Sequence, residues 1–462
     1  MTTAAPEIHR PPWPAVLAVT TGLFVGLTVL RAWDITATFL LQDDQIRYWD
    51  TALRPFSEQP LVGPRTHYGG YALGPLFYWV LWFFRVTFGP FVDNLPHAGA
   101  FGQILLASAA DVLLLLAVWR RARSLPLALG TVLLLATAPF DLALNATIWN
   151  PIMAAIAIKA ATALILLGWG ERSLVHVGVV AALAWSSVHA NLPAIFAVGG
   201  IFVGIVLPPL VVRDMRAAGR RVAAIAGVVV ALQLPYLAHR LWVDPSQGGV
   251  GAVTTSLGQV LTGEEPLRWG ESASWLTESL DRILIDPWQA SWIGWLVAAC
   301  ALFVTVRYRK DIPLLAVTVV PLLGALLGYT LWTRDLDHYY YLSLMPAAGL
   351  ILQSTVSGLT RGRTATVAGV AVLVLAVAIL PARVRQSTTF HRMPGYDGLV
   401  AGSRQILRQE VDVRQIRADF LPPHSNSEFI YLVLGGRLDR EGRWIASIDA
   451  EGLVSYQQVS VP

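Results

Sequence analysis

Two neighbouring carboxylates follow the first apolar stretch of the sequence. Asp43 and Asp44 come shortly after the apolar run 13–33. Neighbouring side chains on a helix or a strand point in different directions, so the two carboxylates cannot easily serve one atom. One can act as a general base while the other orients it or binds a cation. Nearby lipid and a second carboxylate both raise the pKa of a carboxyl group, which brings it toward the range that suits a general base. The simpler alternative is a solvated loop start that caps the preceding helix.

Cationic side chains that suit a phosphate group lie in the same segment and in a later one. Arginine and histidine bind phosphate through charge-assisted hydrogen bonds. The candidates are Arg47, Arg65 and His67, followed by Arg334 and His338 much later in the chain. Each role competes with a simpler interpretation, because an arginine at a membrane surface is often only solvated while its stem covers apolar surface.

Aromatic, amide and imidazole side chains that suit a sugar form a third group. These candidates are Tyr68, Tyr78, Trp149, Asn150, His189 and Tyr339. Trp149 and Asn150 can instead form a helix-entry turn before Pro151. His189 can be a structural histidine at a helix end, and Tyr339 can be an anchor at the membrane surface.

The sequence requires no metal and leaves a divalent cation open. Asp43 with Asp44, or Asp335 with Asp337, offers oxygen ligands that suit a hard cation. No HExxH motif or ligand cluster indicates zinc.

The elements that must position these residues are apolar enough for a membrane. Of 462 residues, 55% are hydrophobic and 14% are charged, against about 25% charged in a soluble domain. This composition excludes a soluble enzyme and a disordered scaffold, and the net charge of +4 is too small for a nucleic-acid binder. Because a span needs roughly 20 apolar residues, we predict about eleven spanning helices, over 13–33, 99–119, 125–139, 151–169, 173–190, 192–212, 221–238, 290–306, 311–331, 338–358 and 364–382.

A further apolar run at 71–92 decides the topology. If it spans, Arg120, Arg121, Arg123 and all later arginine clusters fall outside, against the rule that basic residues stay in the cytoplasm. If it lies along the outer surface, as its many aromatic residues favour, the inner loops and the N-terminal tail hold fourteen basic residues and four acidic ones. We therefore predict a multi-pass plasma-membrane protein with a cytoplasmic N-terminus and an extracytoplasmic C-terminal domain.

The chain divides into a transmembrane module over 1–382 and a C-terminal domain over 383–462. The module has a long first outer loop at 34–98 and a second outer loop at 239–289. The C-terminal domain is richer in charge and is predicted to be a small α/β unit, with a helix over 397–411 and strands over 428–434, 444–448 and 453–459. The predicted fold class is thus an all-α polytopic membrane protein with a small extracytoplasmic α/β domain.

Two charges fall inside predicted spans, where each costs roughly 2.5–3.5 kcal/mol to insert. Asp111 and Lys159 are at depths that their side chains can bridge. We interpret them as a structural ion pair. The alternative is a Lys159 that reaches a lipid phosphate.

The motifs of the first outer loop resemble those of the GT-C glycosyltransferases, in particular the aminoarabinose-transferase and protein-mannosyltransferase-like branch. The resemblance rests on Asp44-Gln45-Ile46-Arg47, Leu61-Val62-Gly63-Pro64-Arg65-Thr66 and Leu73-Gly74-Pro75-Leu76-Phe77-Tyr78. Shorter stretches at 148–151, 188–189 and 338–341 are similar too. The resemblance covers the transmembrane module and is weak over 239–289 and in the tail.

The resemblance implies a GT-C fold with its reaction on the outer membrane face. Enzymes of this class take a sugar from a polyprenyl-phosphate-linked donor. An acid of the first loop deprotonates the acceptor hydroxyl, which attacks the anomeric carbon with inversion. The acid–Gln–X–Arg spacing makes Asp44 this base, whereas the paired acids make it Asp43; we prefer Asp44 because Gln45 and Arg47 then match as well.

The donor, the phosphate contacts and the acceptor follow from the same resemblance. Arg65 and Arg334 would steady the phosphate, and the aromatic residues of 68–84 would hold the sugar and the prenyl chain. The acceptor would be a glycan, a lipid or a protein of the cell envelope. The sequence contains no G-x-G-x-x-G or Walker loop for a nucleotide sugar, which agrees with a lipid-linked donor in the membrane and with no nucleic-acid partner.

Two other functions remain open from the sequence. A transporter or flippase for a lipid-linked saccharide would use the same phosphate contacts and intramembrane charges. It would show an internal repeat, which this sequence lacks, and would not need the long aromatic first loop. A non-catalytic assembly subunit, whose tail binds partners, is the third alternative.

Overall fold

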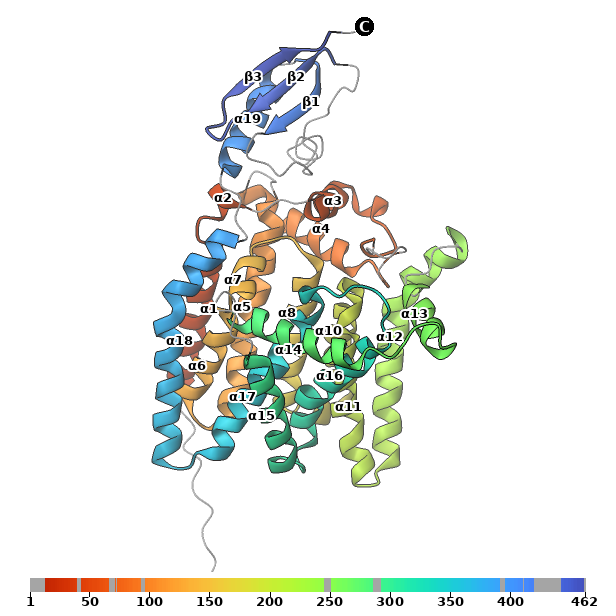
Figure 1. Ribbon diagram of the computed structural model, residues 1–462, viewed down its shortest axis with the longest axis vertical. Coiled ribbons are helices and arrows are strands. Elements are labelled where there is room, and N and C mark those ends of the chain that lie inside the picture. Colours follow the sequence, from red (N-terminus) through yellow and green to blue (C-terminus); the bar gives the residue numbers. More distant parts are fainter. Residues whose placement is uncertain are drawn as a thin grey trace, which may run out of the picture.

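The protein is a helical bundle with a small sheet at one end (Figure 1). The computed structural model describes residues 13–39, 43–65, 71, 73–92, 96–244, 251–285, 292–390, 395–409, 411–418 and 442–460. Together these residues confirm the predicted class of an all-α multi-pass membrane protein with a small α/β unit at its C-terminal end.

Seven helical segments of the described part are long and apolar enough to cross a membrane. They are α1 (Trp13–Ala32), α5 (His97–Ala122), η3 (Leu192–Ala194) with α11 (Ile195–Val211), α12 (Met215–Trp242), α16 (Ile312–Thr330), η4 (His338–Leu344) with α17 (Met345–Leu359), and α18 (Arg363–Phe390). Four shorter apolar helices also coincide with predicted spans: α6 (Leu125–Ala136), α8 (Asn150–Leu166), α10 (Leu174–Ala190) and α15 (Ile293–Arg307). The number of eleven spans stays a prediction, because these four are shorter than a full crossing.

The bundle has a buried centre and a rim that faces lipid. Nearly every residue of α8 is buried, and most of α5 is as well. In α1, α12 and α18 only 11% of the most apolar window is buried. Small residues allow close packing between neighbouring helices: a Cβ on Gly200 of α11 would lie 2.3 Å from the carbonyl oxygen of Ala316 in α16.

The arginine-rich turns lie at the end of the bundle opposite the sheet (Figure 1). Four helices that enter the bundle there begin at a polar side chain that accepts a backbone N–H, a typical N-cap. These caps are Ser124, Ser173, Asp214 and Asp311. Arg121 and Asp311, from two different turns, form an ion pair at this end. The predicted topology depends on these arginine-rich turns lying on one side of the membrane. Which side faces the cytoplasm stays a prediction.

The segment predicted as the first outer loop forms short helices at the end of the bundle nearer the sheet (Figure 1). They are α2 (Ile35–Thr38), α3 (Asp43–Leu53), η1 (Phe56–Glu58), α4 (Leu76–Phe88) and η2 (Gly89–Phe91). At 1.5 Å per residue α4 is about 20 Å long, against about 30 Å for the hydrocarbon core. Its length falls among those of the four shorter apolar helices, so its place along the membrane surface stays a prediction.

The segment predicted as the second outer loop contains two helices, α13 (Gly251–Leu261) and α14 (Trp269–Ile285). Figure 1 shows α14 running across the bundle rather than along it. The Asp281 carboxylate accepts a hydrogen bond from the backbone N–H of Gly294 at 2.6 Å. The Ser272 hydroxyl donates to the carbonyl of Leu326 at 2.9 Å. These bonds tie α14 to α15 and α16, so this segment is part of the bundle.

The C-terminal unit consists of α19 (Tyr396–Gln409) and the strands β1 (Val413–Ala418), β2 (Trp444–Ile448) and β3 (Val454–Gln458). β2 lies in the middle, parallel to β1 and antiparallel to β3. The predicted helix and the strands at 444–448 and 453–459 are confirmed. The predicted strand 428–434 lies outside the described residues, and α18 continues past 382 to Phe390.

The C-terminal unit contacts the bundle through a cluster of three rings. Tyr396 of α19 packs edge-on against Phe39 and against His97 of α5, with ring centroids 5.3 Å apart in both pairs. Phe39 and His97 are 5.2 Å apart. The unit is therefore anchored where the chain leaves the first helix, just before α3.

Candidate active site

Helix α3 presents charged side chains outward and packs its other face on the bundle. Ile46, Trp49 and Ala52 are fully buried. Asp44 and Arg47 form an ion pair one turn apart, and their side chains are 46% and 58% exposed. The apolar spacing makes α3 an amphipathic helix at the surface, so the Asp44 carboxylate is open to a reaction partner.

Tyr48 connects α3 to the helices beneath it. Its hydroxyl donates to Asn150 Oδ1 at 3.0 Å, and Asn150 Nδ2 donates to the carbonyl of Ala190 at 2.7 Å. Burial raises the pKa of the Tyr48 hydroxyl well above its usual range, and the nearby Asp44 carboxylate raises it further. Tyr48 therefore remains a proton donor at neutral pH and fixes α3 against α8 and α10.

Further aromatic side chains gather beside this chain of hydrogen bonds. Tyr78 of α4 lies 6.1 Å from Tyr48 between ring centroids. Burial raises the pKa of the Tyr78 hydroxyl, and the Arg47 guanidinium partly offsets that rise. The ring of Trp149 packs against that of Tyr339 in η4, with the ring centroids 4.9 Å apart. The structure thus brings together six of the residues singled out in the sequence, namely Asp44, Arg47, Tyr78, Trp149, Asn150 and Tyr339.

The His189 side chain packs against Gly74, just before the start of α4. It is fully buried at the end of α10, and its Nε2 lies 3.2 Å from the side-chain amide of Gln233 in α12. Gly74 presses on the ring so closely that a Cβ there would lie 2.2 Å from His189 Nδ1. The glycine of the Leu-Gly-Pro motif is needed for this close approach. His189 is therefore placed to position the start of α4, whereas its predicted contact with substrate stays a prediction.

His338 lies against α14 instead of α3. Its Nδ1 is 2.9 Å from the Ser279 hydroxyl, and its ring packs on Trp275 at 4.7 Å. Its Nε2 is 3.9 Å from a carboxylate oxygen of Glu278. Arg334 is exposed in the turn before η4. Neither residue is among those gathered around Asp44 and Tyr48, so their phosphate roles stay predictions.

The remaining predicted residues are only partly described. Arg65 is exposed, and its backbone pairs with that of Tyr71 in an isolated bridge. His67, Tyr68 and the side chain of Asp43 lie outside the described residues. Asp335 and Asp337 are both exposed. Within the described ranges, no group of three or more His, Cys, Asp or Glu side chains is placed to hold a metal ion.

A buried cluster of four charges lies inside the bundle. Lys159 Nζ of α8 is 2.7 Å from Asp111 Oδ1 of α5, which confirms the predicted ion pair. Arg31 of α1 contacts the other oxygen of Asp111 at 2.6 Å. Asp141 of α7 (Pro139–Leu144) contacts Lys159 at 2.9 Å and Arg31 at 3.2 Å. Two cations and two anions are thus mutually paired.

The sequence interpretation missed two members of this cluster. Arg31 ends an apolar run and looks like a flanking residue at the membrane surface, whereas Asp141 follows the run 125–139 and looks like part of a loop. The available signal was that Arg31 falls inside a predicted span, where a charge needs a partner.

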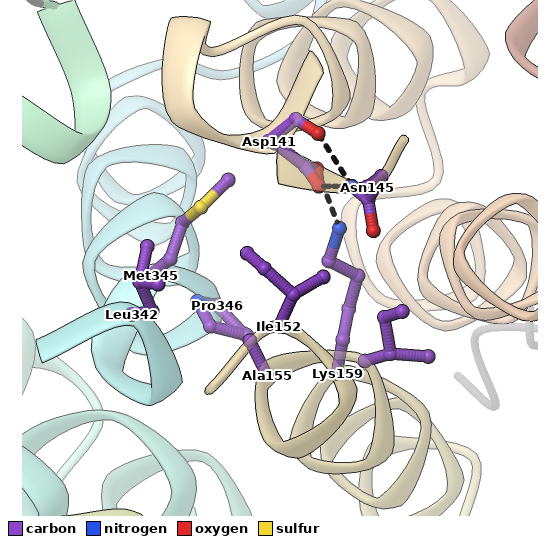
Figure 2. Close-up of a pocket in the computed structure, with 9 residues that line it drawn as sticks. Asp141, Asn145, Ile152, Ala155, Lys159, Leu342, Met345 and Pro346 are labelled. Atoms are coloured by element: carbon purple, nitrogen blue, oxygen red, sulfur yellow. Dashed lines mark hydrogen bonds and ion pairs between the residues drawn. The ribbon is translucent and has the colours of Figure 1, made fainter. Parts of the chain in front are cut away.

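A small cavity of about 10 Å³ borders the cluster, enough for about one water molecule. Figure 2 shows Lys159 and Asn145 both directed at Asp141. Lys159 is 3% exposed and contacts two carboxylates. This arrangement favours the structural interpretation of Lys159 over contact with a lipid phosphate.

Comparison with known proteins gives likenesses in structure only. No protein-family model matches the sequence, and no curated protein matches it significantly. The chain is similar to the crystal structure of ArnT from Cupriavidus metallidurans bound to undecaprenyl phosphate, with 14% identity over 92% of this chain and 86% of that one and a TM-score of 0.48. It is also similar to the Archaeoglobus fulgidus oligosaccharyltransferase in complex with zinc and sulfate, with 13% identity, coverage of 94% and 67%, and a TM-score of 0.47. Both solved proteins are GT-C glycosyltransferases.

Proposed function

We propose that the protein is an inverting glycosyltransferase that takes a sugar from a polyprenyl-phosphate-linked donor. The acceptor is a hydroxyl group of a cell-envelope glycan, lipid or protein, and the reaction takes place at the outer membrane face. The observation that carries the proposal is the gathering of Asp44, Arg47 and Tyr78 with Trp149, Asn150 and Tyr339 at the end of the bundle. Asp44 and Arg47 belong to the motif that resembles the GT-C first loop.

Asp44 serves as the general base in this proposal. Its carboxylate takes the proton of the acceptor hydroxyl as the acceptor oxygen attacks the anomeric carbon from the side opposite the phosphate. The bond between that carbon and the phosphate oxygen breaks, and polyprenyl phosphate leaves with the electron pair. One displacement inverts the anomeric configuration. The exposure of Asp44 at the end of the bundle lets an acceptor from the aqueous side reach it.

Arg47 is placed to act on both partners of the reaction. It pairs with Asp44 and so fixes the direction of the carboxylate. A guanidinium has five N–H donors, so Arg47 can also donate to the leaving phosphate, as can the exposed Arg65. Tyr78, which stays protonated because burial raises the pKa of its hydroxyl, can donate to a sugar hydroxyl.

The described donor set does not fit a protein-built metal site. Asp44 pairs with Arg47, and no three acidic, histidine or cysteine side chains of the described ranges lie together as metal ligands.

The stereochemistry of the product tests the proposal. Purified protein in lipid, supplied with a donor of known anomeric configuration and a candidate acceptor, is expected to give a product of the opposite configuration by NMR. A product that retains the donor configuration would overturn the single-displacement mechanism. A protein that binds donors and moves them between leaflets without cleaving them would be a transporter.

Replacing Gly74 by alanine is expected to reduce the transfer rate at least about tenfold. The added methyl group would collide with the His189 ring and displace the start of α4, and a shift of about 1 Å can cost about a hundredfold in rate. The double variant Gly74→Ala, His189→Ala should recover most of the activity, because the obstructing ring is gone. Initial transfer rates, with thermal unfolding as the control, check this. Equal losses in the single and double variants would contradict a positioning role for the contact.

A further inference from the structure

A second pocket lies at the arginine-rich end of the bundle, opposite α3. Its volume is about 160 Å³. It lies where α5, α8, α9 (Trp169–Arg172), α11 and the start of α16 meet. The wall includes Arg121, Leu166, Gly168, Glu171, Gly204 and Pro313. The proposed reaction uses none of these residues.

Arginine side chains converge on this place. Arg120 and Arg172 both donate to the carbonyl oxygen of Leu167, at 3.3 Å and 3.5 Å. This carbonyl belongs to the end of α8, where the helix dipole attracts cations. Each contact takes one of the five N–H donors of a guanidinium. The two guanidinium groups are therefore already held together next to the pocket and keep donors for an anion.

Two further arginines approach the same pocket. Arg121 lines it and pairs with Asp311. Arg221 of α12 donates to the carbonyl of Ile205 at 2.9 Å, one residue after the lining Gly204. Against these four arginines stand two acids, Glu171 and Asp311. The surroundings thus carry an excess of positive charge where the helices end.

The rest of the wall is apolar or bare backbone. Ile165, Leu166 and Pro313 provide apolar surface. Gly168 has φ 83°, and a Cβ there would meet nothing within 4 Å, so the pocket is open beside its backbone. Positive charge next to apolar wall suits a molecule that carries an anionic group on an apolar body.

We propose that this pocket binds the phosphate of an anionic membrane lipid head group. Arg120, Arg121 and Arg172 would donate to the phosphate oxygens, and the apolar wall would contact the lipid beyond the head group. Basic pockets between membrane helices are a recurring way to hold such lipids. The bound lipid would tie together the ends of α5, α8 and α9. This proposal is independent of the proposed transferase function.

Lipid retention measured by native mass spectrometry tests the proposal. The protein is purified in a neutral detergent and titrated with phosphatidylglycerol, with phosphatidylcholine, or with inorganic phosphate. We expect a saturable complex with phosphatidylglycerol that is at least tenfold tighter than with phosphatidylcholine. The double variant Arg120→Gln, Arg172→Gln should lose at least tenfold in affinity for phosphatidylglycerol, because it removes two cationic donors to the lipid phosphate.

The matched control is Arg213→Gln, Arg216→Gln, which removes the same charge from the turn before α12 at the same end of the bundle and keeps both arginines that contact Leu167 beside the pocket. It should bind phosphatidylglycerol within about twofold of the unmodified protein. Equal losses in both double variants would overturn the proposal in favour of diffuse surface attraction. Inorganic phosphate that competes fully at equal concentration would overturn the lipid assignment. Arg172→Gln alone is the milder variant if the double variant unfolds in the neutral detergent, and unchanged affinity in it would also overturn the proposal.

Discussion

Replacing Lys159 by methionine is expected to lower the free energy of unfolding by about 3–5 kcal/mol. The substitution leaves Asp111 and Asp141 with Arg31 as their cation in the buried cluster, so one negative charge is uncompensated inside the membrane. The cost is high because neither acid is exposed to bulk water: Asp111 is fully buried and Asp141 nearly so. Unfolding in mixed micelles with increasing sodium dodecyl sulfate measures the change.

A compensating variant separates charge balance from contact with substrate. Lys159→Met combined with Asp111→Leu removes one cation and one anion and leaves Arg31 next to Asp141 at 3.2 Å. Because a buried ion pair can be replaced by apolar side chains at little cost, most of the stability should return. Arg54→Met is the exposed control: it breaks the surface pair with Asp50 and should cost at most about 1 kcal/mol.

Two outcomes for the compensating variant would contradict a structural role for the buried charges. If the compensating variant is as unstable as Lys159→Met, the charges are not held together by mutual neutralisation. If it is stable yet inactive, Lys159 acts on the substrate, and the alternative of a lysine at the lipid phosphate is right.

Asp44→Asn is expected to reduce sugar transfer about 10²- to 10⁴-fold, which is the range for loss of a positioned general base. Asparagine keeps the shape of the side chain and cannot accept the acceptor proton at neutral pH. The fold should survive, because Asp44 lies on the exposed face of α3 and the buried face holds the helix.

Helix α3 itself provides the matched control for this substitution. Asp50 also pairs with an arginine, Arg54, at 3.1 Å, and is partly exposed. Asp50→Asn should therefore change the transfer rate by no more than about twofold. A loss confined to Asp43→Asn would identify the neighbouring acid as the base, and equal losses at Asp44 and Asp50 would indicate a general effect on α3.

Local patterns predicted most of the fold. A long apolar run in a membrane forms a helix regardless of which helices pack beside it. Each predicted span accordingly contains a helix in the structure. The strand β1 was missed because its burial repeats every three residues instead of every two. The cause is an irregularity in its pairing with β2, between Val413 and Gln415. A local irregularity of this kind leaves no alternating pattern in the sequence.

The candidate site could be predicted only in part. Asp44 and Arg47 belong to one motif of the sequence and were singled out from it, whereas Tyr48 was not among the candidates. The bond between Tyr48 and Asn150 joins residues 102 positions apart, and the contact of Gly74 with His189 joins two separate helices. Such pairs depend on how the helices pack. The packing of His338 against α14 is of the same kind, and its candidate role at the phosphate stays a prediction.

Release of free polyprenyl phosphate tests the central claim most directly. Purified protein in lipid is given a panel of polyprenyl-phosphate sugars with candidate acceptors, and Asp44→Asn and Asp50→Asn are assayed side by side. The account predicts release by the unmodified protein and by Asp50→Asn, and a rate at least about a hundredfold lower in Asp44→Asn. Donors that bind and are never cleaved, with every candidate acceptor present, would contradict it.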